Sequence, residues 1–442
     1  MKVPKPGYQL KRTPTALGTR GPALDADGDA LRAKRPEPIQ LKQSGAPARA
    51  LEGVRVLDFG WNWAGPMAGQ LLADMGAEVI RVETSKRQDL MRFLDYTSWF
   101  FCHNNRSKLS ATFNLASPDG QRLVQKLARK VDIVMDNFAA GVMAKNGLAY
   151  DNLSKENPDI IVVSMSMAGQ EGPLRGMRGF ASIATGYSGM ELMVGYPEID
   201  TSTGLLPFGL GDTTMAIQAV IGALAALHHR ARTGEGQFVD VSQMDSSAST
   251  LGEPLLAHQL AGDSVGPQGN GHPYFCPHGI FAAAGEERWL TLAARTDQEW
   301  RALCGVMGRD DWAADATLGT SAQRRERAGE INEAITAWSS GLERDAAVES
   351  LVAAGIPAAA LLDLDERNEH PHFVERGLCY RHEFDDFDPC RIYSTPWLFS
   401  ETPAEVTRKT PTLGENNEYV FKQLVELGDD EIARLTKEGV LV

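Results

Sequence analysis

Residues 54–83 read Val54-Arg-Val-Leu-Asp-Phe59, Gly60-Trp-Asn-Trp-Ala-Gly65-Pro-Met-Ala-Gly69, Gln70-Leu-Leu-Ala-Asp-Met75, Gly76-Ala77 and Glu78-Val-Ile-Arg-Val-Glu83, and this segment determines the architecture. The apolar, β-branched runs at its two ends predict buried strands. Between them a glycine-rich turn leads into a helix, which Gly76 ends from the C′ position. Strand, turn, helix and strand within about 30 residues form a βαβ unit, which predicts a parallel sheet with a right-handed crossover.

The same alternation continues along the chain. Ser117-Pro118 predicts the start of a helix, with the serine as N-cap and the proline in the first turn. Val131–Met135 and Ile160–Ser164 are the next apolar runs with strand character. This alternation predicts an α/β fold with a doubly wound sheet over about residues 51–225.

The second half of the chain changes in texture. Met215–His228 is almost wholly apolar and predicts a buried helix, and Gln237–Ser242 predicts another strand. From about residue 285 to 375, short strands alternate with helical runs, which are Asp297–Met307, Arg324–Ser339 and Arg344–Ala354. This part predicts a smaller α+β domain, and a last polar helix is expected over residues 425–440.

The first 50 residues differ from the rest, because they are rich in proline and glycine and hold ten Lys and Arg against four Asp and Glu. We expect an extension that is partly irregular and drapes over a neighbour or stays mobile. A targeting peptide is the alternative, although the segment is not serine-rich and shows no clear amphipathic period.

Composition excludes several classes of protein. The 442 residues suggest two or three domains, and 43% apolar with 23% charged residues is a globular balance. A net charge of −14 argues against a nucleic-acid partner. Five scattered cysteines without a CxxC pair argue against a disulfide framework and a structural zinc. With no apolar run near the ~20 residues that span a bilayer and no secretory signal, we expect no membrane partner and a soluble, cytoplasmic protein.

Other kinds of site fit the sequence poorly. The glycines of the first turn do not have the G-x-G-x-x-G spacing of a dinucleotide site, although Glu83 stands where a ribose-binding acid is found. No phosphate-binding P-loop and no G-x-S-x-G elbow is present. His228-His229 and His370-Pro-His372 lack accompanying cysteines or carboxylates, so no metal site is expected.

Asp212 is the candidate acid. It stands in Gly209-Leu-Gly-Asp-Thr-Thr214, directly before the apolar helix. One interpretation is an N-cap, in which the carboxylate accepts N–H groups of the first helical turn. The other is a reactive carboxylate that the glycines leave accessible and that attacks a carbonyl carbon. Local sequence alone leaves both open.

A series of motifs in register resembles the family III CoA-transferases, the superfamily of formyl-CoA and carnitine CoA-transferases and α-methylacyl-CoA racemase. The resemblance runs from about residue 51 to 442. The matching pieces are Leu51–Phe59, Ala64-Gly-Pro66, Gly76–Glu83, Asn105-Arg-Ser-Lys108, Asp136-Asn-Phe138, Gly211-Asp212, Arg232–Ser242, Gly271-His-Pro273, Ala354-Gly-Ile-Pro357 and Pro411-Thr-Leu-Gly-Glu415.

The resemblance implies a large, Rossmann-like, CoA-binding domain built from both chain ends, here residues 51–225 and 390–442. Residues 226–389 are then a linker and the small α+β domain, and two subunits form an interlocked dimer, either a homodimer or a heterodimer with a related subunit. It also implies transfer of CoA from an acyl-CoA donor to a carboxylic acid, without a metal. Asp212 is then the catalytic nucleophile, which passes through an aspartyl anhydride and an aspartyl thioester.

By position in the family, the implied contacts to coenzyme A are Trp61, Asn62, Trp63, Ala64, Phe113, Asn137, Phe138, Lys145 and Arg178. Thr84 and Ala116 stand where some relatives have Arg and Lys, and Lys86 and Arg87 are the nearby cations that substitute for them in this interpretation. Ala181 replaces an acid that racemases use for proton transfer, so racemisation is disfavoured.

Aromatic residues are dense around the first turn and just after it, at Trp61, Trp63, Tyr96, Trp99, Phe100 and Phe101. They are either core residues or the lining of a pocket, and the second case favours a bulky or aromatic acceptor such as an aryl-substituted succinate. A partner-dependent or non-catalytic subunit of a heteromeric enzyme is the alternative function. The resemblance names neither the donor nor the acceptor.

Overall fold

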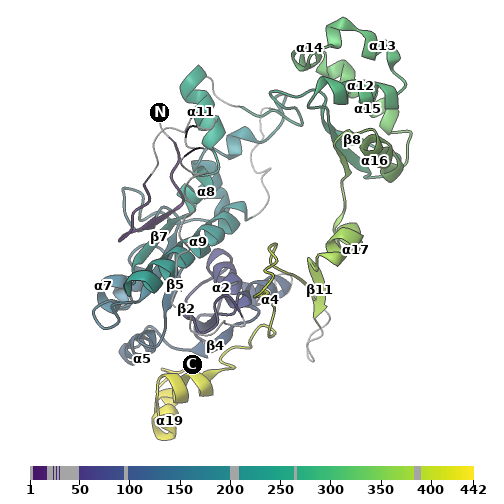
Figure 1. Cartoon of the computed structure of the whole chain (residues 1–442). Helices are drawn as coiled ribbons and strands as arrows, with labels where there is room; N and C mark the ends of the chain where they lie inside the picture. Colours follow the sequence, from purple (N-terminus) through teal and green to yellow (C-terminus); the bar gives the residue numbers. More distant parts are fainter. Residues whose placement is uncertain are drawn as a thin grey trace. The chain divides into compact units, whose positions relative to one another are not determined.

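The computed structural model describes residues 3–16, 49–93, 98–199, 209–262, 266–382 and 390–442, and the single residues 23, 26 and 29. The chain divides into two compact units (Figure 1). The large unit comprises Met1–Met190, Pro207–Asp263 and Gly377–Val442, and the small unit comprises Glu191–Leu206 and Ser264–Arg376. Residues 226–262, which we assigned to the linker and small domain, therefore lie in the large unit, because their strand pairs with its sheet.

The described strands of the large unit form one seven-stranded sheet in the order β1-β7-β6-β5-β2-β3-β4. Their bounds are β1 Tyr8–Leu10, β2 Arg55–Asp58, β3 Glu78–Glu83, β4 Leu109–Thr112, β5 Ile133–Asp136, β6 Ile161–Ser166 and β7 Phe238–Ser242. Strands β2 to β7 are parallel, and β1 adds antiparallel to β7. Counted from β2, this is the strand order of dinucleotide-binding folds, with its switch point between β2 and β5. The predicted α/β class with a parallel sheet is confirmed.

Alternate side chains of the parallel strands enter two different cores, which explains why these strands read as continuous apolar runs. Val56 of β2 belongs to a core shared with helices α2 (Ala64–Asp74) and α9 (Leu210–Thr233). Leu57 points to the opposite core, which is filled by α5 (Pro118–Ala128) and by the C-terminal segment around Leu435. Both Val56 and Leu57 are fully buried.

The remaining helices that the structure describes in the large unit are short. They are α3 Leu90–Phe93, α4 Ser98–Asn105, α6 Val142–Lys145, α7 Tyr150–Leu153, α8 Ala181–Tyr187, α10 Gln243–Ala248, α11 Gly252–Ala261, the π-helix η4 Tyr419–Leu424 and α19 Asp429–Lys437. A two-stranded ribbon, β11 Cys379–His382 with β12 Cys390–Tyr393, completes this unit. The polar helix expected over 425–440 is therefore α19, preceded by the π-helical turn.

The small unit has its own antiparallel sheet, β10 (Ala358–Ala360), β9 (Trp289–Ala293) and β8 (His278–Ala282), in that order. Its helical elements are η2 Glu191–Met193, α12 Asp297–Val306, α13 Asp310–Ala314, η3 Ala316–Leu318, α14 Ser321–Glu326, α15 Ala328–Ser339, α16 Arg344–Ala353, α17 Leu364–Glu369 and α18 Pro371–Glu375. The prediction of a single helix over Arg324–Ser339 was wrong. The helix is interrupted at Arg327, between α14 and α15.

Helix α9 is long and apolar enough to cross a membrane by length and composition, with 24 residues and a mean hydropathy of 1.5. One face, including Met215, Ala219 and Ala223, is buried in the sheet core, as in the core helix of a globular protein. Glycine at position 222 allows the close approach, because a Cβ there would lie 2.7 Å from Val239 of β7.

Candidate active site

Asp212 lies in the first turn of α9, but it does not cap the helix. The N-cap is Gly209, and Asp212 is the third helical residue. Gly209 has a positive φ of 84°, which favours glycine, and a Cβ there would lie 2.2 Å from the ring of Trp63. The N-cap interpretation of Asp212 is therefore wrong, and Trp63 of the first turn lies against the start of the Asp212 helix.

The carboxylate of Asp212 has one described hydrogen-bond donor. Nε2 of Gln243 lies 3.0 Å from Oδ1, whereas no residue in the described part of the chain donates to Oδ2. Burial raises the pKa of Asp212 to about 6, and the Gln243 hydrogen bond opposes this rise. Ala181, at the start of α8, packs on the neighbouring Gly211, where a Cβ would lie 3.0 Å from the Ala181 carbonyl oxygen. Burial thus keeps the carboxylate poorly solvated, and within the described residues only Oδ1 has a hydrogen-bond donor.

The first turn lies at the switch point of the sheet, where Trp61 follows β2 and Asn137 follows β5. The Trp61 N–H donates to Oδ1 of Asn137 at 2.7 Å, and Nδ2 of Asn137 donates back to the Trp61 carbonyl at 2.8 Å. The Trp61 ring meets Phe138 edge to face at 6.3 Å, and the Arg87 guanidinium lies 4.7 Å from the ring centroid. Ligands of open α/β sheets bind at such a switch point, beyond the carboxyl ends of the strands.

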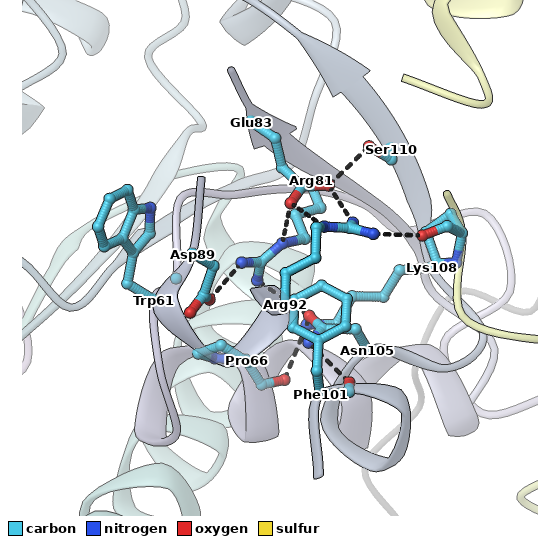
Figure 2. A network of polar contacts seen from close by, with 12 residues as sticks. Trp61, Pro66, Arg81, Glu83, Asp89, Arg92, Phe101, Asn105, Lys108 and Ser110 are labelled. Atoms are coloured by element: carbon cyan, nitrogen blue, oxygen red, sulfur yellow. Dashed lines mark hydrogen bonds and ion pairs between the residues drawn. The ribbon is translucent and has the colours of Figure 1, made fainter. Parts of the chain in front are cut away.

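A network of buried polar side chains contacts this turn and holds it in place (Figure 2). Asp89 accepts the N–H of Asn62 at 3.0 Å and also forms an ion pair with Arg81 at 2.6 Å. Nζ of Lys108 donates to Asp58 and to the Pro66 carbonyl, each at 2.8 Å. Because the side chains of Arg81, Asp89, Asp58 and Lys108 are at most 1% exposed, the turn rests on partners that solvent does not displace.

The network continues through Glu83 at the end of β3 to Ser110 of β4. Glu83 pairs with Arg81 at 3.2 Å and with Arg92 at 2.7 Å, and it accepts the Ser110 hydroxyl at 2.7 Å (Figure 2). These cations lower the pKa of Glu83, although burial alone raises it. Burial lowers the pKa of Lys108 to about 8, against the pull of Asp58. Glu83 is thus fully engaged and does not offer a ribose-binding carboxylate.

The other residues implied by the family lie apart from this cluster or in the core. Ala64 is the buried first residue of α2, and Phe113 is 1% exposed and packs edge to face on Phe421. Lys145, at the end of α6, and Arg178, before α8, are exposed. Phe113 thus offers no side-chain surface, whereas the two cations are open to solvent.

Thr84, Lys86 and Arg87, which follow β3, also differ in what their side chains contact. The Thr84 hydroxyl donates to the Val442 carbonyl, and Lys86 donates to the Gly439 carbonyl at 3.3 Å. Of the two nearby cations, Arg87 therefore lies over the first turn, and Lys86 contacts the C-terminal segment. Phe101 is buried, and the guanidinium groups of Arg81 and Arg92 lie 5.3 and 4.2 Å from its ring centroid. Tyr96 and the side chain of Trp99 lie outside the described residues.

Sequence reasoning missed Gln243 and Asp89. Gln243 follows β7 directly, so its place at the carboxyl edge of the sheet was a usable signal, but 31 positions separate it from Asp212. Asp89 stands in a polar loop after β3, and its contacts with Asn62 and Arg81 depend on tertiary structure.

Among the described side chains, no group of three or more His, Cys, Asp or Glu is placed to hold a metal ion. His370 instead caps α18, since its Nδ1 accepts the N–H of His372. The buried side chains of Cys276 and Cys304 are free thiols.

Comparison with known proteins identifies the family. The family model of CoA-transferase family III matches residues 51–417. Succinyl-CoA–D-citramalate CoA-transferase of Chloroflexus aurantiacus is 33% identical over 401 residues, which are 89% of this chain and 99% of the relative. The alpha subunit of a succinyl-CoA–L-malate CoA-transferase, also from Chloroflexus aurantiacus, is 31% identical over 92% of this chain and 96% of its own.

Among solved structures, a CAIB/BAIF family protein from Brucella suis superposes with a TM-score of 0.78 at 26% identity, over 85% of this chain and 99% of that one. The resemblance seen in the sequence motifs is confirmed by these matches. The chain therefore belongs to CoA-transferase family III and is, like its named relatives, a CoA-transferase.

Proposed function

We propose that Asp212 is the covalent nucleophile of this CoA-transferase. The observation that carries the proposal is the half-buried carboxylate in the first turn of α9, with Oδ1 bonded to Gln243 and Oδ2 without a described donor. Burial raises the pKa of Asp212 to about 6, so the group is ionised at neutral pH yet more basic than a solvated carboxylate. Such a carboxylate is suited to attack the acyl carbon of a thioester.

The reaction then proceeds by exchange of activated acyl groups. Oδ2 attacks the donor acyl carbon, the carbon–sulfur bond breaks, and CoA thiolate leaves a mixed anhydride. The thiolate attacks Cγ of Asp212, and the donor acid departs with Oδ2 as the aspartyl thioester forms. The acceptor carboxylate attacks Cγ and expels the thiolate, which then attacks the acceptor carbonyl and regenerates Asp212. Each step exchanges groups of similar energy, so covalent catalysis replaces one difficult transfer by easier ones.

Coenzyme A is proposed to bind along the first turn, at the switch point between β2 and β5. Trp61, Asn62, Trp63 and Ala64 line this turn, and Asn137 and Phe138 hold it from β5. Arg87 over the Trp61 ring and the exposed Lys145 and Arg178 are the cations we assign to the phosphates. Contact of Trp63 with Gly209 connects this turn to Asp212 and supports a route for the thioester between them.

The names of the relatives suggest the substrates. Two of them use succinyl-CoA with D-citramalate or L-malate, so we propose succinyl-CoA as donor and a dicarboxylic acid as acceptor. A bulky or aromatic acceptor remains a second candidate, which the half-buried Trp63 beside Gly209 supports. Phe101 does not support it, because its ring is buried beside two arginines. Exchange from succinyl-CoA to malate, citramalate and an aryl-substituted succinate separates the two candidates.

Trapping the intermediate tests the nucleophile. The protein is incubated with succinyl-CoA and hydroxylamine, and the peptide containing Asp212 is analysed by mass spectrometry. We expect a hydroxamate on Asp212, which Asp212→Asn abolishes together with exchange, while Asp245→Asn, an exposed acid in the first turn of α10, keeps both. Labelling at another residue, or undiminished exchange by Asp212→Asn, contradicts the proposal.

The same experiment addresses assembly. We propose a dimer as the working form, and the alpha-subunit name of one relative supports testing an unlike partner as well. Activity of the purified chain alone supports a homomeric enzyme. Labelling that requires a co-expressed related subunit supports the heteromeric alternative. Racemisation is disfavoured, because Ala181 packs beside Gly211 without a proton-transferring group.

A further inference from the structure

We propose that Gln243 is the hydrogen-bond donor for the oxyanion that forms on Oδ1 of Asp212 whenever Cγ of this residue is attacked. The inference rests on the proposed function and assigns a catalytic role to the first residue of α10. It follows from which of the two carboxylate oxygens the amide contacts.

The contact is directional. Nε2 of Gln243 lies 3.0 Å from Oδ1, within the range of about 2.7–3.1 Å at which oxyanion donors act. An ionised carboxylate only accepts hydrogen bonds, so the amide presents its nitrogen to Asp212. Because no described residue donates to Oδ2, the two oxygens are distinguished before the reaction begins.

The chemistry uses this distinction twice. When the thiolate attacks Cγ of the anhydride, the carbon–sulfur bond forms and the carbonyl electrons move to Oδ1. The tetrahedral intermediate collapses by breaking the bond from Cγ to Oδ2, and the donor acid carries that oxygen away. When the acceptor carboxylate later attacks the thioester, negative charge again appears on Oδ1 and the thiolate leaves. Oδ1 is therefore the oxyanion in both steps at Cγ, and it is the atom that Gln243 contacts.

The fold holds this donor in place. Gln243 is 3% exposed and is the first residue of α10, directly after β7. The Ser242 hydroxyl caps α10 by accepting the N–H of Asp245 at 3.1 Å, and the Met244 N–H donates to the Met167 carbonyl at 3.0 Å. A donor fixed at a sheet edge needs little rearrangement as charge develops, which is the condition for electrostatic stabilisation of a transition state.

A neutral amide also suits the resting enzyme. A cation at the same place would hold Asp212 ionised but would weaken its attack on the donor thioester, since an opposite charge lowers the basicity of a carboxylate. The glutamine stabilises charge on Oδ1 while burial keeps the carboxylate basic. One side chain thus serves the ionised carboxylate and the later oxyanion.

Gln243→Met tests the assignment, because methionine has a similar length and no amide donor. Ser247→Ala is the matched control, since Ser247 lies on the same helix and its buried hydroxyl has no described partner. We expect kcat of Gln243→Met to fall by about 10²–10³-fold, the loss typical of one oxyanion donor, with little change in KM for succinyl-CoA. Ser247→Ala keeps the wild-type kcat.

Two intermediates separate this role from a merely structural one. Without acceptor, succinyl-CoA converts the wild type into the aspartyl-CoA thioester, which intact-protein mass spectrometry detects as a CoA adduct less water. In Gln243→Met, thioester formation slows in proportion to kcat. Hydroxylamine also attacks Cγ, so the hydroxamate on Asp212 forms more slowly, but it still accumulates on long incubation, because anhydride formation places no charge on Oδ1. Equal rates of thioester formation in the two proteins overturn the role of Gln243.

Loss of hydroxylamine labelling in the wild type itself would instead overturn the proposed function of Asp212. Gln243→Glu is the second variant, for use if the methionine protein unfolds, and it replaces the donor by an acceptor of the same size. It is expected to lose at least as much kcat as Gln243→Met. A Gln243→Glu enzyme with wild-type kcat also overturns the assignment.

Discussion

Burial of the Asp212 carboxylate destabilises the folded protein when the group is ionised. Its pKa is raised from 3.8 to about 6 by burial, so the folded protein binds this proton more tightly than the unfolded chain does. The stability that the group contributes is complete below about pH 4 and is lost as the pH rises through about 6. The proposed reaction therefore requires the pH range in which the ionised group destabilises the fold.

Asp212→Asn is expected to raise the free energy of unfolding at pH 8 by about 1–3 kcal/mol, since each pKa unit corresponds to about 1.4 kcal/mol. At pH 4 the gain is expected to vanish, because the wild-type carboxyl group is then protonated and, like the amide of the variant, uncharged. Urea unfolding of both proteins at the two pH values measures the difference. An equal gain at both pH values would show that the effect does not come from ionisation.

The sequence identified Asp212 but not its surroundings. Its glycine-rich context left both an N-cap and a nucleophile open, and the position of Gly209 as N-cap excludes the first of them. The signal for Gln243, its place directly after a strand, is weak, because an amide there is common and its role depends on a contact with a helix residue 31 positions earlier. Residue type and local context can point to a candidate functional residue such as Asp212. Its role depends on the side chains that the tertiary structure brings into contact with it, such as Gln243.

At the scale of elements, Lys108 and Asp58 connect β2, β4 and α2. Their side chains are fully buried and lie 2.8 Å apart, and a Cβ on Gly69 of α2 would lie 2.7 Å from Asp58. Lys108→Met leaves the Asp58 charge buried without its partner, and we expect a loss of about 3–5 kcal/mol. Adding Asp58→Asn removes the remaining charge, so the double variant is expected to recover part of this loss.

Urea midpoints of the wild type, the two single variants and the double variant form the double-mutant cycle that measures this coupling. A double variant that loses the sum of the two single losses would show that the pair does not interact.

Strand β1 belongs to the segment that we expected to be a partly irregular extension. Within this segment, Tyr8 pairs with Val241 and Leu10 with Val239, so β1 covers the edge of the sheet next to β7. Deleting residues 1–16 exposes the unpaired backbone of β7, and we expect a lower melting temperature and increased aggregation. Light scattering during thermal unfolding measures both.

Arg12→Ala is the control for this deletion, because it removes only exposed side-chain contacts, the ion pair with Glu235 and the hydrogen bond to the Tyr150 hydroxyl. Such pairs contribute about 0–1 kcal/mol, so this variant is expected to melt close to the wild type. If the deletion variant melts like Arg12→Ala and stays clear, β1 does not protect the edge.

Elements were predictable where burial imposes a pattern. The strand at Glu78–Glu83 matches its prediction residue for residue, since its β-branched residues Val79, Ile80 and Val82 are buried. Helix α2 starts six residues before the predicted Gln70, because its first turns hold Gly65 and Pro66, which resemble a loop. β1 was missed because its three residues gain their conformation from the edge of β7 and carry little propensity of their own.

At the scale of the whole molecule, two packed helices present apolar side chains to solvent. Phe180, Ile183 and Tyr187, at the start of α8 and along it, are 71%, 41% and 62% exposed. Ile217 and Ile221 lie one turn apart on α9 and are 46% and 43% exposed. Large apolar side chains exposed on two packed helices favour a protein interface, and Ile217 lies on the same helix as Asp212 of the proposed site.

We expect a second copy of the chain to cover this surface. Ile221→Arg places a charge in the proposed interface, and a charge buried without a partner is unfavourable, so the variant is expected to dissociate into monomers and to lose exchange activity. Leu398→Arg, at another exposed apolar side chain (65% exposed), is the control and is expected to keep the mass and activity of the wild type. Sedimentation equilibrium at micromolar concentrations measures the masses. A wild type that sediments as a monomer of 48.1 kDa while fully active, or an Ile221→Arg variant that remains dimeric, would show that the surface serves another purpose.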